Sequence, residues 1–314
     1  MKLEKILRLT PEYRDYVWGG NRLRSNGERT AEAWIVYENN LIQNGIHAGR
    51  TLGQLAAEFG EALLGNKSND KPHQQFPILI KLLDCAQWLS LQIHPNDEQA
   101  RLLEGPQHIG KTEAWHIIEA SQNAQLIAGF RPEVKKNEVI KAIRNKSILD
   151  FVQYHSVHAG DSVFMPAGTI HALGPGLLLY EVQQSSDITY RVYDWNRPET
   201  PERPLHIEKS QAVVNLTTDS KVIPLKIGMN QSSQTLVSCQ YFTLEYLRCN
   251  VGKTIMDTQQ DSFHALTVLA GQATVIADDE VAHLDCFETA LISSYTGKYS
   301  IQTNEGCTLL KTSI

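Results

Sequence analysis

The stretch GDSVFMPAGTIHALG, residues 160–174, decides the fold of this chain. Its leading Gly160 favours a turn, and the apolar residues that follow predict a short strand. The Pro-Ala-Gly sequence at 166–168 ends that strand, because proline lacks a ladder donor and glycine accepts turn conformations. His171 then begins another strand. The pattern predicts a tight turn that points one imidazole toward the inside of a β-structure.

The same stretch resembles the second sequence motif of the cupin β-barrels. That motif reads Gly, five residues, Pro-x-Gly, two residues, His, and the chain matches it from Gly160 to His171. Pro175 stands where the motif usually has asparagine. The resemblance implies a barrel with this histidine as a metal ligand.

Short strands are predicted along most of the remaining chain, from alternating or compact apolar runs between turn residues. Clear cases are the segments at 77–85, 88–95, 113–120, 124–130 and 177–184. Apolar residues at helical spacing predict helices at 51–66 and 133–152, with a short helix or turn at 96–104 and a short helix at 207–215. Many short strands with glycine-rich turns favour a sandwich or barrel, so we predict a mostly β fold.

A polar segment with several prolines, at 196–222, predicts a connector between two domains. We expect residues 1–222 to form a catalytic, metal-binding cupin domain that includes the two longer helices. Residues 223–314 are predicted to form a second cupin-like β domain, because TVLAGQATVIADDE at 267–280 has a strand–turn–strand pattern. The sequence of this second domain offers no set of metal ligands.

Composition limits the classes of partner. The 314 residues carry a net charge of -6 with a pI near 6.0, which argues against a nucleic-acid partner because such proteins show basic patches. No apolar run approaches the ~20 residues that span a bilayer, and the N-terminus lacks the apolar core of a signal peptide. We therefore expect no membrane partner and a cytoplasmic location. The five cysteines form no C-x-x-C pair and are expected to be reduced, mostly buried thiols.

Side chains typical of a metal site occur on three predicted strands. Gln92 and His94 are two residues apart on one strand, so both point to the same face. Glu113 adds a carboxylate and His171 a second imidazole, whereas His116, three residues after Glu113, should point to the opposite face. This set suits zinc and also iron(II), so ligand type alone leaves the metal open. Gln92 is predicted to contribute its amide oxygen, either to the ion or to a water on it.

Longer motifs carry a resemblance to one enzyme family. They lie at 16–20, 31–34, 76–81, 89–95, 111–113, 166–171, 181–187, 190–195 and 205–208. The chain resembles the type I mannose-6-phosphate isomerases, also called phosphomannose isomerases, in their short bacterial form. The motifs are specific in combination, and the Gln-x-His-Pro segment at 92–95 and the Thr-Tyr-Arg-x-Tyr-Asp segment at 189–194 are not general cupin features. The likeness covers residues 1–210 well and is thin beyond.

The resemblance implies a bicupin, two jelly-roll barrels with a small helical insertion. It also implies a zinc enzyme with one ion per chain and a sugar phosphate substrate, interconverting mannose 6-phosphate and fructose 6-phosphate. Such an exchange passes through an enediolate that a divalent ion stabilises. The alternatives left open are another metal-dependent cupin enzyme, either a sugar-phosphate isomerase or an iron dioxygenase, and a non-catalytic sugar-binding cupin. The oligomeric state does not follow from the sequence.

Four further residues are candidates for chemistry and substrate binding. Arg191 matches the family's catalytic arginine and is expected to bind substrate and stabilise negative charge, the alternative being a salt-bridged arginine. Lys111 lies two residues before Glu113 and should share its face, where it would bind substrate phosphate or assist proton transfer. Glu181 is a candidate general base, or a partner that orients a ligating histidine. Lys81 aligns with a family lysine and is predicted to bind substrate or form an ion pair.

Overall fold

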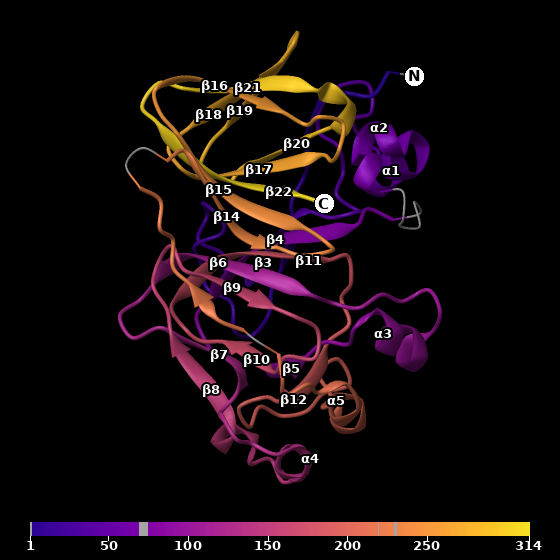
Figure 1. Cartoon of the computed structure of the whole chain (residues 1–314), viewed down its shortest axis with the longest axis vertical. Coiled ribbons are helices and arrows are strands. Elements are labelled where there is room, and N and C mark those ends of the chain that lie inside the picture. The colour runs from indigo at the N-terminus through magenta and orange to yellow at the C-terminus, as the bar shows by residue number, and fades with distance from the viewer. Residues whose placement is uncertain (1, 69–74, 219, 229–230) are drawn as a thin grey trace. The chain divides into compact units, whose positions relative to one another are not determined.

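A computed structural model of the protein describes residues 2–68, 75–218, 220–228 and 231–314. Its elements are mainly short antiparallel strands with few helices (Figure 1), so the predicted mostly β fold is confirmed. The chain divides into two compact units. The terminal unit contains Met1–Glu12, Trp34–Lys81 and Leu225–Ile314, and the central unit contains Tyr13–Ala33 and Leu82–Pro224.

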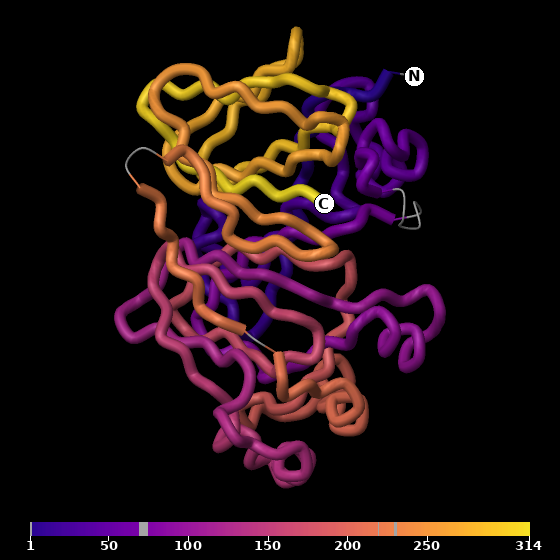
Figure 2. Tube along the Cα trace, viewed as in Figure 1, coloured from indigo at the N-terminus to yellow at the C-terminus, as the bar shows by residue number. Residues whose placement is uncertain are grey.

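The two units are discontinuous in sequence, unlike the single boundary predicted between residues 222 and 223. Strand β1 (Ile6–Arg8) pairs with β20 (Thr289–Ile292), so the N-terminal strand belongs with the C-terminal strands. Figure 2 shows the indigo N-terminal trace in the same unit as the yellow C-terminal trace. Such long-range pairing leaves no local signal in the sequence, so a prediction with one domain boundary does not include it.

Two antiparallel sheets build the terminal unit. Their strand orders are β1-β20-β17-β22-β15-β14 and β16-β21-β18-β19. The remaining strands are β14 (Ser233–Ser238), β15 (Thr243–Cys249), β16 (Gly252–Asp257), β17 (His264–Ala270), β18 (Ala273–Ala277), β19 (Glu280–Leu284), β21 (Lys298–Thr303) and β22 (Cys307–Ser313). Leu266, Val275 and Leu309 belong to one buried cluster with residues from both sheets, as expected when two sheets pack face to face.

The central unit also has two sheets. One has the order β12-β5-β10-β7-β8, and the other contains β13-β9-β6-β11 as neighbours. Their bounds are β5 (Leu91–Ile93), β6 (Glu113–Ala120), β7 (Gln125–Phe130), β8 (Val152–Ser156), β9 (Ser162–Met165), β10 (His171–Leu173), β11 (Leu177–Gln184), β12 (Tyr190–Tyr193) and β13 (Val222–Ile223). Along the chain, three strands run from one unit into the other: β2 (Glu12–Arg14), β3 (Glu32–Val36) and β4 (Ile78–Cys85). Two units of two sheets each agree with the predicted bicupin.

The helix predicted at 51–66 is broken in two. Helix α1 (Leu52–Phe59) begins with a capping box, in which the Thr51 side chain accepts from the Gln54 amide and the Gln54 side chain accepts from the Thr51 amide. Gly60, with φ of 45°, separates α1 from α2 (Glu61–Leu64). Two short 3₁₀ turns complete the helical content of the terminal unit, at Asn66–Ser68 and Ser294–Thr296.

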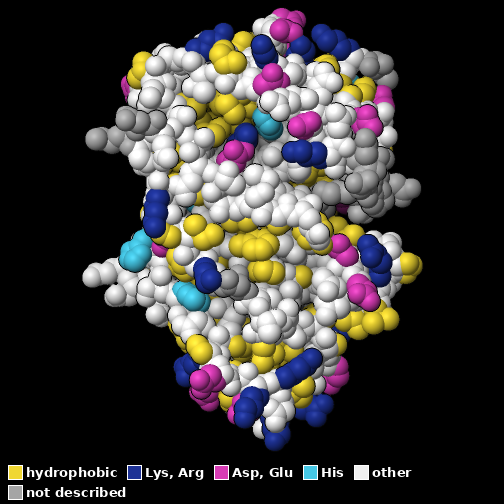
Figure 3. Space-filling view, in the orientation of Figure 1, with side chains coloured by type: hydrophobic (Ala, Val, Ile, Leu, Met, Phe, Trp, Pro, Cys, Tyr) yellow, Lys and Arg dark blue, Asp and Glu magenta, His cyan; other side chains and the backbone are white. Residues whose placement is uncertain are grey.

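The helix predicted at 133–152 is shorter than expected. Helix α4 (Lys136–Arg144) is followed by a 3₁₀ turn (Ile148–Asp150), and Val152 instead begins β8 opposite Phe130. Lys and Arg side chains gather at the lower end of the view in Figure 3, where Figure 1 places α4. Helices α3 (Asp97–Glu104) and α5 (Ile207–Val213) match the shorter predictions. None of the described helices is long and apolar enough to cross a membrane.

Strand register in the central unit aligns the side chains that the sequence singled out. Strand β5 lies between β10 and β12, and Gln92 is the direct partner of His171 on one side and of Arg191 on the other. In the second sheet, Glu113 on β6 is the direct partner of Gln183 on β11. Direct partners in antiparallel strands point to the same face, about 5 Å apart. The register therefore groups Gln92, His171 and Arg191 on one sheet and pairs Glu113 with Gln183 on the other.

The turn before β10 depends on Gly168. Its φ is 86°, a conformation that strains residues with a side chain. Its amide donates to the carbonyl of His94 at 2.8 Å, and its carbonyl accepts from the amide of Asn215 at 3.0 Å. A Cβ added here would lie 2.9 Å from Cβ of Asn215 and 3.0 Å from the carbonyl oxygen of Val213. Gly168 thus ties the turn to His94 in a space that excludes a side chain.

We expect Gly168→Ala to lower the free energy of unfolding by about 2–5 kcal/mol, because left-handed backbone costs about 1–2 kcal/mol and forced packing about 1–3 kcal/mol more. Gly27→Ala is the matched control, since its φ is 71° but nothing lies within 4 Å of the added Cβ. That control should cost only the backbone part, about 1 kcal/mol. Urea unfolding followed by tryptophan fluorescence measures both. Equal losses in the two variants would contradict this explanation of the turn.

Candidate metal centre

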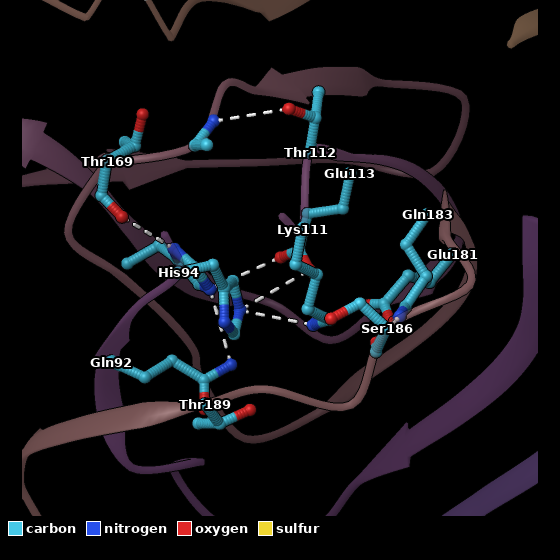
Figure 4. A network of polar contacts seen from close by, with 12 residues as sticks. Gln92, His94, Lys111, Thr112, Glu113, Thr169, Glu181, Gln183, Ser186 and Thr189 are labelled. Atoms are coloured by element: carbon cyan, nitrogen blue, oxygen red, sulfur yellow. Dashed lines mark hydrogen bonds and ion pairs between the residues drawn. The ribbon is translucent and has the colours of Figure 1, made fainter. Parts of the chain in front are cut away.

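Three buried side chains, those of His94, Glu113 and His171, lie together in the central unit. Their ligand atoms are all within 4.8 Å of one another, and the residues are 2%, 0% and 1% exposed. His94 follows directly after β5, Glu113 begins β6 and His171 begins β10, so both sheets contribute. Figure 4 shows Gln92, His94 and Lys111 converging on this place. The fold thus brings together the three residues that the sequence selected.

Backbone carbonyls orient both imidazoles. Nδ1 of His94 lies 2.8 Å from the carbonyl oxygen of Ile188, and Nδ1 of His171 lies 2.9 Å from that of Thr169. A carbonyl only accepts, so each Nδ1 carries the proton and donates it. Each Nε2 therefore keeps its lone pair, which is the tautomer that a metal ligand needs.

The carboxylate of Glu113 lies among nitrogen atoms. Its Oε1 is 3.2 Å from Nε2 of His171, and its Oε2 is 3.5 Å from Nε2 of His94. The ammonium of Lys111 lies 2.5 Å from Oε2 and also donates to Nε2 of His94 at 3.1 Å. The prediction that Lys111 shares the face of Glu113 is confirmed by these contacts. Two atoms that would bind a metal ion, Oε2 of Glu113 and Nε2 of His94, are thus already in contact with the positive charge of Lys111.

Protonation states favour metal binding. Burial, together with the positive charge of Lys111, lowers the pKa of His171 to about 3, so the ring is neutral near pH 7. His116 is a different case, because its Nδ1 lies 2.9 Å from Oγ of Ser162 and it is not part of the cluster. Burial alone lowers the pKa of His116 to about 4. This agrees with the expectation that His116 points away from Glu113.

The amide of Gln92 borders the cluster. Its Nε2 lies 3.2 Å from Nε2 of His171 and its Oε1 accepts from Oγ of Ser90 at 3.4 Å. The nitrogen therefore faces the His171 ring, where the sequence predicted the oxygen. Because Nε2 of His171 has a free lone pair, the amide donates to it. Ligation through the oxygen of Gln92 stays a prediction.

Arg191 is half-buried on β12. Its Nη1 donates to the carbonyl of Pro204 at 2.9 Å, and its Nε has no hydrogen-bond partner among the described residues. Burial and then the positive charge of Arg203 lower its pKa, but a guanidinium stays protonated at neutral pH. The salt-bridged alternative is not found in the described part of the chain, where the nearby Asp194 bonds Arg197 and Arg203 instead.

Glu181 is linked to the cluster through Trp115, a residue that the sequence argument did not select. Its Oε2 accepts from Nε1 of Trp115 at 2.9 Å, and the Trp115 ring packs edge-on against His171 with centroids 5.4 Å apart. Register makes Glu181 and Trp115 direct partners on the face that also carries Glu113. In the sequence, a tryptophan on a core strand indicates only ordinary packing, so its contacts with Glu181 and His171 become evident only in the structure.

Lys81 belongs to the terminal unit. It is 7% exposed, and its ammonium lies 5.1 Å from the centroid of the Trp34 ring. This distance allows a cation–π contact, which offsets part of the cost of burying the charge. Substrate binding by Lys81 stays a prediction.

The donor set fits a divalent metal ion. Two imidazoles whose Nε2 atoms carry lone pairs and one carboxylate point to a common place, and each imidazole has a carbonyl that fixes its orientation. Three such ligands leave coordination positions for water or substrate, as in catalytic zinc sites. The set contains no sulfur, and the same ligand types also accept iron(II). The central unit therefore contains a metal-binding centre.

Comparison with known proteins links this centre to one family. The family model described as phosphomannose isomerase type I, catalytic domain, matches residues 6–133. Mannose-6-phosphate isomerase ManA of Bacillus subtilis (strain 168) is 31% identical over 314 aligned residues, covering 95% of this chain and 96% of that protein. The crystal structure of the mannose 6-phosphate isomerase from Bacillus subtilis aligns with a TM-score of 0.87 and 28% identity, covering 99% of this chain and 100% of that chain. A zinc-bound mannose 6-phosphate isomerase structure, 15% identical, shares the fold with a TM-score of 0.75 over 98% of this chain and 99% of that chain.

We expect elemental analysis of the purified protein to find about one divalent ion per chain, a count that follows from three ligands converging on one point. His171→Ala and Glu113→Gln should each weaken zinc binding by at least about 100-fold, since the first removes an imidazole and the second replaces an anionic ligand by a neutral amide. His158→Ala is the matched control, because that side chain is 85% exposed in the same unit. Metal loss from this control equal to that from His171→Ala would contradict the assignment.

Proposed function

Because this chain belongs to the type I mannose-6-phosphate isomerase (phosphomannose isomerase) family, we propose that it interconverts mannose 6-phosphate and fructose 6-phosphate with one zinc ion per chain. Family membership makes it an aldose–ketose isomerase and supersedes the dioxygenase and sugar-binding alternatives. The observation that carries the proposal is the buried His94–Glu113–His171 group, with both Nδ1 atoms held by carbonyls.

The reaction moves a proton between C1 and C2 of the sugar and exchanges a carbonyl for a hydroxyl, through an enediolate. His94, Glu113 and His171 would hold the zinc ion, which supplies Lewis-acid polarisation of the sugar oxygens when bound. The three ligands are buried, and burial strengthens every electrostatic interaction at the centre relative to water. Their strands and the carbonyl anchors supply the rigidity that such preorganisation requires.

Arg191 supplies a fixed positive charge for the sugar oxygens. It shares a sheet with His171, separated from it by the single strand β5, and register puts both side chains on one face. Its Nε is buried and has no hydrogen-bond partner among the described residues, so a bound sugar oxygen would satisfy it. Lys111 supplies a second cation directly at the cluster, and its ammonium has donors to orient a substrate oxygen or phosphate.

Glu181 is the proposed proton carrier between C1 and C2. It is buried on the same strand face as Gln183, the register partner of Glu113, which places its carboxylate beside the centre. The bond from Trp115 holds Oε2 in position. A carboxylate kept on one side of the sugar can remove a proton from one carbon and return it to the next. Lys81 completes the set as a proposed substrate-binding residue.

A coupled assay tests the proposed reaction. Purified protein given mannose 6-phosphate should form fructose 6-phosphate, lose this activity after chelation, and regain it when zinc is added back. An exposed-surface variant such as His158→Ala should behave as the wild type throughout. Inactivity of the zinc-loaded wild type on this substrate would refute the proposed function, and full activity after complete metal removal would refute the zinc requirement.

Arg191→Ala should reduce kcat by about 10²–10³-fold, the usual effect of removing one preorganised donor to developing charge. Its zinc content should match the wild type, because Arg191 contacts none of the three ligands in the described structure. Arg144→Ala, an exposed arginine on α4, serves as the control for loss of positive charge alone. Wild-type kcat in Arg191→Ala would remove this residue from the mechanism.

A further inference from the structure

Cys249 and Cys307 face each other in the terminal unit, at one end of the β15–β22 ladder. The strand register makes them direct partners, and they form the last pair of that ladder. Cα atoms of direct antiparallel partners lie about 4.5 or 5.5 Å apart, and their side chains point to the same face. A disulfide needs a Cα separation of about 4.4–6.8 Å. The backbone therefore already holds the two residues at bonding distance.

The surroundings of the pair keep it reduced but reactive. Both thiols are free and belong to the core between the two sheets, with Cys249 2% and Cys307 5% exposed. A hydrogen bond from the Cys307 thiol lowers the pKa of Cys249 to about 7, although burial acts in the opposite direction. The same hydrogen bond and burial raise the pKa of Cys307. One sulfur is thus prepared as a nucleophile and the other remains a thiol.

Exposed residues lie close to both cysteines in the sequence. Cys249 is followed by the exposed turn residues Asn250 and Val251, and Cys307 is preceded by the exposed Asn304 and Glu305. Both cysteines therefore sit at strand ends, next to turns that face water. Their low exposure excludes bulky reagents and favours a small oxidant.

The other three cysteines lack this arrangement. Cys85 is buried, and burial raises the pKa of its thiol well above the usual value. Cys239 and Cys286 each lie near a backbone carbonyl, at 3.5 Å from that of Phe242 and 3.1 Å from that of Leu269. None of the three is the register partner of another cysteine in the described strands. Cys286 is exposed and so provides an internal comparison for plain thiol oxidation.

We propose that Cys249 and Cys307 form a redox site that a small hydroperoxide such as hydrogen peroxide converts to a disulfide. The Cys249 thiolate attacks the peroxide, forming an S–O bond while the O–O bond breaks and hydroxide leaves. The Cys307 sulfur then attacks the resulting sulfenic acid, forming the S–S bond as the S–O bond breaks. The leaving hydroxide takes the Cys307 proton, so two thiols are oxidised by two electrons and the peroxide is reduced to water.

The disulfide would join the two ends of the segment 250–306, which contains six complete strands of the terminal unit. Closing a loop of this length restricts the unfolded chain more than the folded one. The bridge therefore stabilises the terminal unit, while the metal centre lies in the central unit and takes no part in the reaction.

Mass spectrometry on the full-length protein tests the proposal. After brief exposure to hydrogen peroxide, the oxidant is removed, the protein is unfolded in excess N-ethylmaleimide so that every free thiol is blocked, and it is digested without reduction. The expected product is one linked peptide pair containing Cys249 and Cys307, which disappears on reduction, together with a rise in Tm of about 5 °C. The proposal is overturned if both residues still carry N-ethylmaleimide at a dose that has fully oxidised the exposed Cys286.

Two variants separate the steps. In Cys307→Ser the sulfenic acid on Cys249 has no resolving thiol, so dimedone present while the oxidised protein is unfolded should label Cys249 strongly, whereas the wild type should show little label there. Cys286→Ser should leave the bridge unchanged. Equal dimedone labelling of Cys249 in the wild type and in Cys307→Ser would overturn the proposed pairing, and so would loss of the bridge in Cys286→Ser.

Discussion

The buried carboxylate of Glu113 is the constraint on which the metal centre depends. The residue is fully buried, and a carboxylate in such a place is tolerated only when it is paired and hydrogen-bonded. The ammonium of Lys111 donates to one carboxylate oxygen, and the Nε2 lone pairs of His94 and His171 face the same carboxylate. The carboxylate and the two lone pairs together form a group of acceptors that a cation would stabilise. The same requirement makes the site attractive to a divalent cation.

Backbone groups fix the positions and orientations of the candidate metal ligands. The carbonyls of Thr169 and Ile188 fix the two imidazoles, and the Gly168 amide bonds the carbonyl of His94. The turn that contains Gly168 and Thr169 therefore contacts one ligand and orients the other. Arg191, for which we propose a substrate-binding role, comes from the same sheet as His171, so these residues are positioned by paired strands.

The sequence predicted the members of the cluster better than their orientation. His94, Glu113 and His171 could be predicted because residue types that bind metals, their spacing along strands and the Pro-x-Gly turn can all be read from one sequence. The anchors of both imidazoles are backbone carbonyls, which every residue has, so no sequence pattern marks them. The rotation of the Gln92 amide depends on Ser90 and His171 together. The orientation of these side chains is therefore determined by contacts that form only in the folded protein.

The fold was predicted in class and missed in its long-range connections. Alternating strands identified a mostly β chain, whereas the pairing of β1 with β20 joins residues from opposite ends of the sequence. The helix expected at 133–152 ends early because Val152 gains a strand partner in Phe130, and that pairing outweighs local helix propensity. The pairing of Cys249 with Cys307 is also a long-range strand contact, and their spacing along the chain matches no motif, so the sequence does not predict it.

X-ray absorption at the zinc edge of the zinc-loaded protein tests the central claim most directly, because it reports the ligand types at the ion itself. The account predicts the scattering of two imidazole rings, with the remaining ligands nitrogen or oxygen at about 2.0–2.2 Å and no sulfur. A sulfur shell at about 2.3 Å, or a spectrum without imidazole scattering, would contradict the assignment of the ion to His94, Glu113 and His171.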